Sequence, residues 1–244
     1  MSERTAGVER VADHNLRNWA MAENARARLT KRKAQETVGP YLAISRELGT
    51  GGGEIASLVA QSLDWEVMDR EIIDYMVEKY GTPRELVNYF DEKHTSWLEE
   101  VFDSWIKGQR FTESTYVHRL TRLLLLAANH GKVVIVGRGA AFLLPRSRGL
   151  SVRIVAPLDY RIEQVKRMRD ATEKDARRLI EDSDRQRAEF IKSHFHHDAC
   201  NVHEYDLVVN VEKIDPSDAV DLITTTVKTW LQKQGAETLV HDAQ

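Results

Sequence analysis

Short apolar stretches alternate with longer, mixed stretches along most of this chain. Five of the apolar stretches contain only four or five residues each and lie at 41–45, 65–68, 133–136, 152–156 and 207–211. Runs this short, apolar on both faces, are typical of strands buried inside a parallel sheet. The intervening stretches have the length and composition of helices, so the alternation predicts an α/β core with a doubly wound sheet.

Two regions between strands are longer than a simple crossover requires. Residues 70–131 separate the second and third strands and contain four helical patterns, at 70–80, 83–90, 97–107 and 114–130. We expect them to form a helical insertion over one edge of the sheet. A second helical region, 170–200, separates the fourth and fifth strands and is strongly polar.

The first 38 residues are polar, helix-prone and without a clear apolar stripe. Residues 1–36 carry eight Lys and Arg against five acids. Gly39-Pro40 ends this helix, because proline cannot continue it. We expect a solvated or partner-docking arm at 1–38, with a nucleic-acid-binding arm as the alternative. The main domain then spans 39–235, and 236–244 form a tail.

Composition excludes several classes of protein. The longest apolar run, Leu123 to Ala128, is far shorter than the roughly 20 residues of a membrane span. No charged-then-apolar leader opens the chain, and the single cysteine, Cys200, cannot form an internal disulfide. A net charge of −3 argues against a general nucleic-acid surface. We therefore expect a cytoplasmic protein without membrane or nucleic-acid partners.

A glycine-rich loop joins the first strand to an amphipathic helix. Glycines at such a junction let the backbone curl so that its N–H groups point into one concavity, and the helix N-terminus adds partial positive charge. The pattern favours a phosphate-binding loop over a plain glycine-rich turn. The loop residues expected to contact the ligand are Gly49, Thr50, Gly51, Gly52, Gly53 and Glu54.

From Gly49 to Tyr75 the sequence resembles bacterial cytidylate kinases, in which a G-[ST]-G-K-G-T loop leads through a helix to a strand that ends in Asp. Asp69 falls on that Asp, and Ser45-Arg46-Glu47 before the loop is similar to the cytidylate-kinase-like family. The resemblance covers about residues 41–231. It implies a P-loop kinase-like, three-layer α/β/α fold with a five-stranded parallel sheet in the order 2-3-1-4-5. It also implies ATP and Mg²⁺ as cofactors.

The loop departs from the family pattern at three positions. Gly52 replaces the lysine, Glu54 replaces the hydroxyl residue, and Arg46 stands where the first P-loop glycine belongs. The lost lysine contacts the transferring phosphate, so its absence bears on catalysis more than on binding. We hypothesise that Arg46 supplies the missing charge and that Ser45 or Thr50 supplies the hydroxyl. The alternative for Arg46 is a surface ion pair.

The resemblance extends to residues that hold the acceptor nucleotide. Arg138 follows the third strand, and Asp184 and Arg187 match an Asp-x-x-Arg pattern in a lid-like helix. An arginine at a strand's carboxyl end can clamp a phosphate. The alternatives are a helix-capping or ion-paired Arg138, an Asp184–Arg187 pair on a solvated helix, and a helix-capping role for Asp69. The family's Asp after Arg138 is Gly139 here, so cytosine recognition does not carry over.

Further charged and metal-ligating side chains lie in the same polar region. Three arginines are candidates for lid residues that screen phosphates: Arg177, Arg178 and Arg185. Five side chains could ligate zinc: His194, His196, His197, Cys200 and His203. Their spacing matches none of the strong paired patterns, so we expect a polar helix end without a metal.

These observations favour an ATP-dependent phosphotransferase that acts on a CMP-like nucleotide or a similar small phosphorylated acceptor. Arg46, Arg138, Asp184 and Arg187 are the candidate catalytic residues, and Asp69 joins the last three at the acceptor. The first alternative is a nucleotide-binding regulatory protein with a degenerate P-loop. The second is an interaction protein that forms a homo-oligomer through its N-terminal helix.

Overall fold

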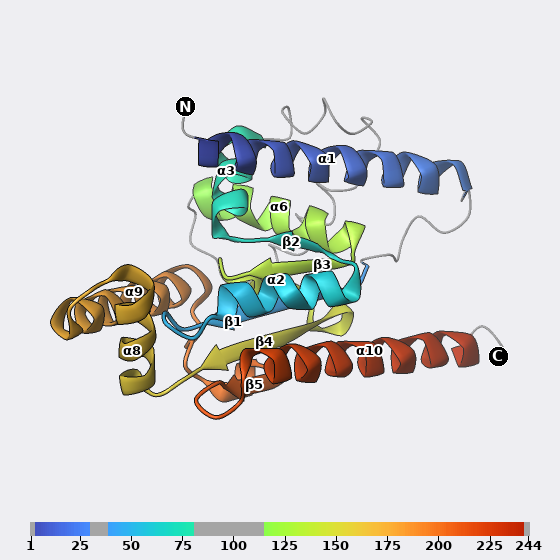
Figure 1. Cartoon of the computed structure of the whole chain (residues 1–244). Helices are drawn as coiled ribbons and strands as arrows, with labels where there is room; N and C mark the ends of the chain where they lie inside the picture. Colours follow the sequence, from blue (N-terminus) through green and yellow to red (C-terminus); the bar gives the residue numbers. More distant parts are fainter. Residues whose placement is uncertain (1–2, 30–38, 81–114, 242–244) are drawn as a thin grey trace.

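A computed structural model of the chain describes residues 3–29, 39–80 and 115–241 (Figure 1). Its five strands are parallel and hydrogen-bonded in the order β2-β3-β1-β4-β5, which confirms the expected order. The first residue of β1, Tyr41, lies opposite Val133 on one side and Gly149 on the other. The strands are β1 (Tyr41–Arg46), β2 (Glu66–Met68), β3 (Val133–Val136), β4 (Gly149–Val155) and β5 (Leu207–Asn210).

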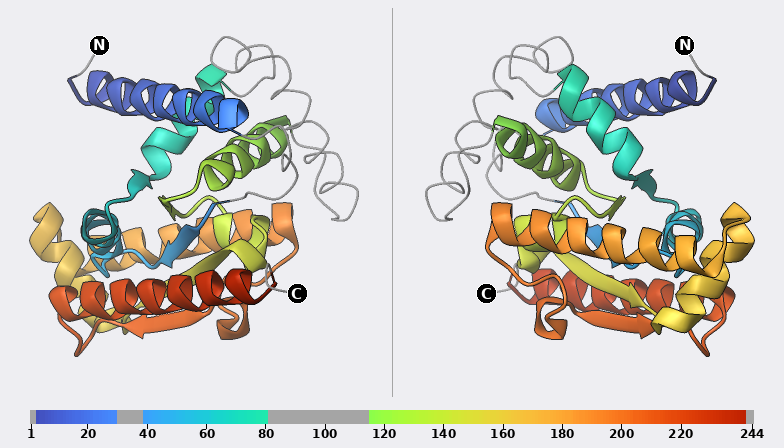
Figure 2. Two further views of the ribbon diagram at one scale, coloured as in Figure 1. Left: turned by 90° about the vertical axis from the view of Figure 1, so that its right-hand side faces the viewer. Right: turned by 90° about the vertical axis from the view of Figure 1, so that its left-hand side faces the viewer.

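Helices cover both faces of this sheet. Since successive side chains of a strand point to opposite faces, Leu42 and Ile44 pack with α2 and α10, whereas Tyr41 and Ala43 pack with α1, α3 and α6. The three layers are visible in Figures 1 and 2. The helices are α1 (Glu3–Leu29), α2 (Gly52–Leu63), α3 (Arg70–Tyr80), α6 (Thr115–His130), α7 (Ala140–Leu143), α8 (Leu158–Arg169), α9 (Glu173–Phe195) and α10 (Pro216–His241), with 3₁₀ turns η1 (Arg146–Arg148) and η2 (Val202–Glu204).

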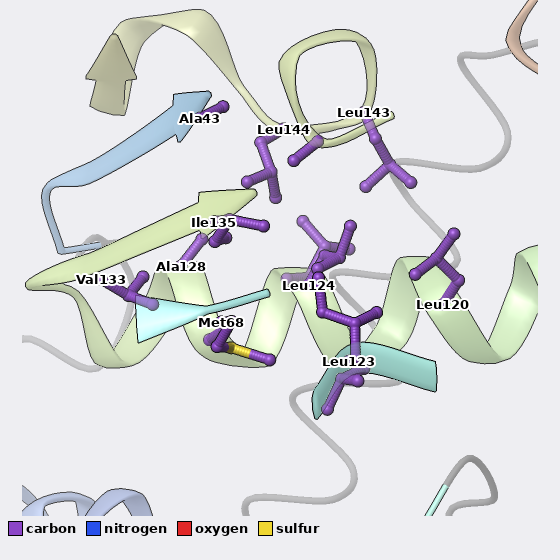
Figure 3. Close-up of a cluster of buried hydrophobic side chains, with 14 of the residues drawn as sticks. Ala43, Met68, Leu120, Leu123, Leu124, Ala128, Val133, Ile135, Leu143 and Leu144 are labelled. Atoms are coloured by element: carbon purple, nitrogen blue, oxygen red, sulfur yellow. The ribbon is translucent and has the colours of Figure 1, made fainter. Parts of the chain in front are cut away.

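The insertion at 70–131 covers a face of the sheet as far as it is described. α6 places Leu124 and Ala128 in the same apolar cluster as Val133 and Ile135 of β3 (Figure 3). α6 therefore lies over the sheet at β3, the neighbour of the edge strand β2. The helices expected at 83–90 and 97–107 lie outside the described residues.

The N-terminal helix is not a solvated arm. Ala12, Leu16 and Trp19 of α1 are at most 1% exposed, and they pack in one cluster with α3 and α6. Trp19 Nε1 also donates a 2.7 Å hydrogen bond to Glu66 at the start of β2. These residues follow a 3.6-residue period, but the many charged residues around them hide the stripe. The apolar side chains Ala12, Leu16 and Trp19 are therefore part of the core of this chain.

The structure bears on one of the two remaining predicted domain boundaries. The boundary at residue 38 falls among residues that are not described, and α10 continues to His241 through most of the predicted tail. Among the described helices, none combines the length and apolar character that a bilayer span requires.

The helices α8 and α9 form a hairpin at the carboxyl end of the sheet (Figure 1). Ile162 and Val165 of α8 pack with Ala176 and Ile180 of α9 in a small separate cluster. The C-terminal part of α9, including its last residue, Phe195, packs in the main core. α9 therefore spans from the hairpin to the body of the protein and covers the ends of the strands.

Candidate functional site

The glycine loop is a tight five-residue turn, 47–51, between β1 and α2. Gly49 (φ 88°) and Gly51 (φ 69°) adopt left-handed conformations that favour glycine. A Cβ on Gly49 would also lie only 2.7 Å from the carbonyl oxygen of Arg161 in α8. The loop therefore packs against the hairpin, and its shape depends on glycine at two positions.

Only part of the loop backbone is available to an anion. The buried hydroxyl of Thr50 donates to the carbonyl of Glu47 (2.9 Å) and accepts a 3.3 Å hydrogen bond from the N–H of Gly52. The N–H groups of Gly53 and Glu54, in the first turn of α2, have no hydrogen-bond partner in the described part of the chain. The N–H of Gly52, one of the expected ligand contacts, therefore already has a hydrogen-bond partner within the loop. Thr50 is also poorly placed to replace the missing hydroxyl, because its own hydroxyl is already engaged.

The side chain of Arg46, the last residue of β1, passes between Gly52 and Gly137. A Cβ on Gly52 would lie 2.6 Å from Arg46 Cβ, and a Cβ on Gly137 would overlap Arg46 Nη1. Within the described residues, Arg46 forms no ion pair. Burial, together with repulsion from Arg187, lowers the pKa of Arg46 to about 10, so the side chain remains cationic at neutral pH. The alternative of a surface ion pair is wrong for this arginine.

A cavity of about 300 Å³ opens beside Arg46 at the carboxyl ends of β1, β3 and β4. Apolar side chains such as Phe142 and Ile191 form part of its wall, and α9 contributes residues from 183 to 191. Two carboxylates, Glu47 and Asp184, line it against five arginines. This excess of positive charge in the cavity wall is suited to a phosphorylated ligand. The arginines are Arg46, Arg70, Arg138, Arg153 and Arg187.

Both carboxylates of the cavity are already neutralised by arginines. Glu47 accepts from Arg153 (3.1 Å), lies 3.5 Å from Arg161 and also accepts from the N–H of Ala156 (3.3 Å). Arg161 in turn contacts Asp184 at 2.6 Å. This series of contacts connects the glycine loop, β4, α8 and α9. Asp184 thus pairs with a distant arginine and not with Arg187 three residues along its own helix.

Arg187 is the second arginine of the cavity without an ion pair in the described residues. Its Nη1 donates a 2.8 Å hydrogen bond to the carbonyl oxygen of Arg46. Burial lowers the pKa of Arg187, while the nearby charge of Asp184 opposes that shift. Arg46 and Arg187 therefore place two uncompensated positive charges side by side. A phosphate dianion is the natural counter-charge for such a pair.

Arg138 combines an ion pair with a place in the cavity wall. It forms a close ion pair with Asp74 of α3, which also lies 3.6 Å from Arg70. Its guanidinium lies 5.9 Å from the ring centre of Tyr116 and 5.8 Å from that of Phe190, within reach of cation–π attraction. The ion-paired alternative is therefore correct, and Arg138 nevertheless lines the cavity.

Asp69 caps α3, because its Oδ1 accepts the N–H of Ile72 at 2.9 Å. It also lines a second cavity, of about 400 Å³, together with Glu54 at the start of α2. Arg46 and Arg70 line both cavities and so stand between them. The capping role is confirmed, and Asp69 lies beside the loop, outside the arginine-rich cavity.

Sequence reasoning missed Arg70 and Arg153. Arg153 lies in the middle of β4 between Val152 and Ile154, and its side chain is only 9% exposed. An arginine inside an apolar strand was a usable signal, because arginine is rarely buried without a reason. Arg70 had no such signal, since it follows Asp69 at the exposed start of a helix.

The candidate lid arginines do not reach either cavity. Arg177 lies 4.0 Å from Asp159, whereas Arg178 and Arg185 both contact Asp182 on the outer side of α9. All three side chains are between 43% and 84% exposed. They belong to the solvated surface of the hairpin.

The histidine-rich segment after α9 is held by neighbouring side chains. His194 meets Phe190 edge to face with 4.8 Å between ring centres, and His197 Nδ1 lies 3.1 Å from Glu204. Cys200 Sγ lies 3.9 Å from the guanidinium of Arg153. In the part of the chain that the structure describes, no three His, Cys, Asp or Glu side chains are placed to hold a metal ion.

Comparison with known proteins places this geometry in a family. The model of the cytidylate kinase-like family matches residues 41–213. No curated protein matches the sequence. Among solved structures, an uncharacterized protein from Eubacterium ventriosum is 21% identical, with a TM-score of 0.60 over 78% of this chain and 98% of that chain.

Two kinases of known structure are more distant. A shikimate kinase from Bacteroides thetaiotaomicron is 14% identical, with a TM-score of 0.44 over 77% of this chain and 98% of that chain. A gluconokinase from Sinorhizobium meliloti is 9% identical, with a TM-score of 0.43 over 83% of this chain and 99% of that chain. At 21% sequence identity, the likeness to the Eubacterium protein supports a shared fold and nothing more.

Proposed function

Because the chain belongs to the cytidylate kinase-like family, we propose that it transfers the γ-phosphate of ATP to a small phosphorylated acceptor such as a CMP-like nucleotide. The observation that carries this proposal is the arginine-lined cavity beside the glycine loop. Five arginines face two carboxylates there, and both carboxylates are occupied by ion pairs. A neutral or cationic acceptor would leave Arg46 and Arg187, which form no ion pair in the described residues, without a counter-charge.

In this proposal each reactant has its own place. The acceptor phosphate lies between Arg138 and Arg187 in the cavity, while Asp184 anchors the hairpin through Arg161. The donor phosphates lie at the loop, against the N–H groups of Gly53 and Glu54 at the start of α2. A phosphate acceptor is already ionised at neutral pH, so the reaction needs positioning and charge neutralisation more than a general base.

The chemical step is a direct displacement. An oxygen of the acceptor phosphate forms a bond to the γ-phosphorus as the bond to the bridging oxygen breaks, and ADP leaves with that electron pair. The developing charge on the transferring group lies next to Arg46, between the two cavities. Burial of this region by α9 excludes water, which would otherwise accept the phosphoryl group.

Magnesium fits this site as a companion of the nucleotide. Mg²⁺ is commonly held by one or two carboxylates together with substrate phosphates and water. Glu54 and Asp69 are both in the wall of the second cavity, beside the loop, and would be the protein ligands. The ion would neutralise charge on the donor phosphates.

A nucleotide-binding regulator with little activity is the second candidate. Two observations favour it: the N–H of Gly52 is occupied by Thr50, and Glu54 places a carboxylate in the first turn of α2. Both features weaken contacts that a phosphate-binding loop normally makes.

Turnover measured on a matched pair of variants separates these candidates. We expect ADP release from ATP and Mg²⁺ to depend on a phosphorylated acceptor, with CMP as the first probe. Arg187→Ala should reduce turnover about a hundredfold, because it removes a charge contact to the phosphate. Arg185→Ala, two residues away and 62% exposed, should behave like wild type. Nucleotide binding without turnover for every phosphorylated acceptor would favour the regulator, and equal effects of the two variants would contradict the assigned cavity.

A further inference from the structure

The side chain of Arg46 takes a path that excludes a lysine at position 52. Its Cβ and Cγ would lie 2.6 and 3.0 Å from a Cβ on Gly52, and Thr50 Oγ1 would lie 3.2 Å from it, so a side chain at position 52 would force Arg46 out of its place. The next residue, Gly53, has nothing within 4 Å of the same hypothetical atom. The crowding is therefore specific to position 52 and not a general property of the helix start.

Gly137, after β3, provides room for the other end of the side chain. A Cβ there would overlap the guanidinium nitrogen Nη1 of Arg46 and lie 3.4 Å from its Cζ. Glycine is thus present at both points where the arginine passes close to backbone. The guanidinium ends beside Arg187 and Arg138, in the wall shared by the two cavities.

We propose that Arg46 is the catalytic cation of this protein, and that it reaches the transferring phosphate from the strand through a channel made by Gly52 and Gly137. Arginine at position 46 and lysine at position 52 are then mutually exclusive solutions to one charge requirement. The steric part of this proposal stands on the contacts alone, whereas the catalytic part rests on the proposed phosphotransfer.

Unfolding experiments test the steric part without any assay of activity. Gly52→Ala should lower the urea midpoint in wild type, because its methyl group meets Arg46 Cβ. In the Arg46→Gly background the same substitution should be neutral or stabilising, since alanine is favoured over glycine in a helix. The Arg46→Ala background keeps the Cβ and should not relieve the clash. Gly53→Ala is the matched control and should be tolerated in all three backgrounds.

If Gly52→Ala changed the urea midpoint by the same amount in the wild-type and Arg46→Gly backgrounds, the steric part would be overturned. So would relief of the clash by Arg46→Ala, because the 2.6 Å contact involves Cβ. These outcomes do not depend on whether any acceptor is turned over.

Binding of pyrophosphate, as a probe of the donor's terminal phosphates, tests the charge. Arg46→Gly should weaken binding in calorimetry by about tenfold or more, and Arg46→Gly/Gly52→Lys should restore most of it. Gly53→Lys in the Arg46→Gly background adds the same charge one residue away and should restore less. No loss in Arg46→Gly, or equal rescue by the two lysines, would overturn the assignment.

Turnover supplies the final readout. Arg46→Gly should reduce kcat by about a hundredfold, the usual effect of losing one charge contact made in the transition state. The double variant Arg46→Gly/Gly52→Lys should have a kcat at least tenfold higher than that of Arg46→Gly. Recovery of pyrophosphate binding without recovery of kcat would overturn the catalytic part. If wild type turns over no acceptor, the proposed phosphotransfer fails, and the unfolding and pyrophosphate results still decide the path and charge of Arg46.

Discussion

Glu47 is the side chain on which the ion pairs around the glycine loop depend most. Its carboxylate contacts Arg153 and Arg161, whose side chains are only 9% and 10% exposed, and it accepts the N–H of Ala156. Glu47→Gln keeps the shape of this side chain and removes its charge. Arg161 retains Asp184 at 2.6 Å, but Arg153 loses its acidic partner. The substitution therefore leaves one nearly buried guanidinium uncompensated.

Breaking a buried ion pair from one side typically costs about 3 to 5 kcal/mol, and the retained Asp184 contact favours the lower end, about 3 kcal/mol. For a chain of this size that corresponds to a loss of roughly 6 to 12 °C in Tm. Urea unfolding followed by tryptophan fluorescence measures the change in free energy directly. Glu54→Gln is the control, since Glu54 lies in the same region, is exposed and forms no ion pair in the described residues.

The control should shift the free energy of unfolding by no more than about 0.5 kcal/mol. A Glu47→Gln protein as stable as wild type would show that the contacts around this carboxylate contribute little. That result would refute the view that the loop, β4 and the α8–α9 hairpin are held together through Glu47.

Three further outcomes follow from single contacts. Pyrophosphate affinity should fall as pH rises through about 10, because Arg46, with its pKa lowered to about 10, loses its positive charge there. Arg46→Gly should lack this step in the same titration. Trp19→Phe should cost about 1 kcal/mol in urea unfolding, because it removes the hydrogen bond to Glu66, and an unchanged midpoint would contradict the packing of α1. Gly51→Val should weaken ATP binding in calorimetry through backbone strain of about 1 to 3 kcal/mol at φ 69°. A steric clash is not the cause, because a Cβ at position 51 would meet no atom within 4 Å. Unaltered affinity would show that the loop shape does not matter for ATP.

The sheet and the loop were predictable because their signals are local. Each buried strand is a short apolar run, and the glycines at 49 and 51 occupy positions whose φ angles favour glycine. The resemblance to the family indicated Arg138, Asp184 and Arg187, and the structure brings all three to one cavity. The pattern of residue types is sufficient when neighbours in sequence decide the geometry.

The partners of these residues were not predictable in the same way. Glu47 and Arg153 are 106 positions apart, and Arg187 contacts the carbonyl of Arg46 across 141 positions. No spacing rule relates residues that meet only after the sheet has formed. Asp184 illustrates the consequence, because its local partner Arg187 was the obvious candidate and Arg161 is the actual one.

Helix α1 was misjudged for a different reason. Its apolar face is narrow and consists partly of alanine, so average hydrophobicity conceals it, although Leu16 and Trp19 are fully buried. The path of Arg46 was beyond sequence reasoning as well, since the atoms that crowd positions 52 and 137 belong to a side chain that begins elsewhere, and Gly137 also has a φ of 83° that favours glycine.

The most direct test of the central claim follows the phosphoryl group itself. Phosphorus NMR of the full chain with ATP, Mg²⁺ and CMP should show the γ-phosphate signal of ATP decline while ADP and a new diphosphate of the acceptor appear together. Arg187→Ala should slow that exchange about a hundredfold and Arg185→Ala should not. Appearance of inorganic phosphate alone, or an unchanged spectrum with every phosphorylated acceptor supplied, would contradict phosphotransfer by the arginine-lined cavity.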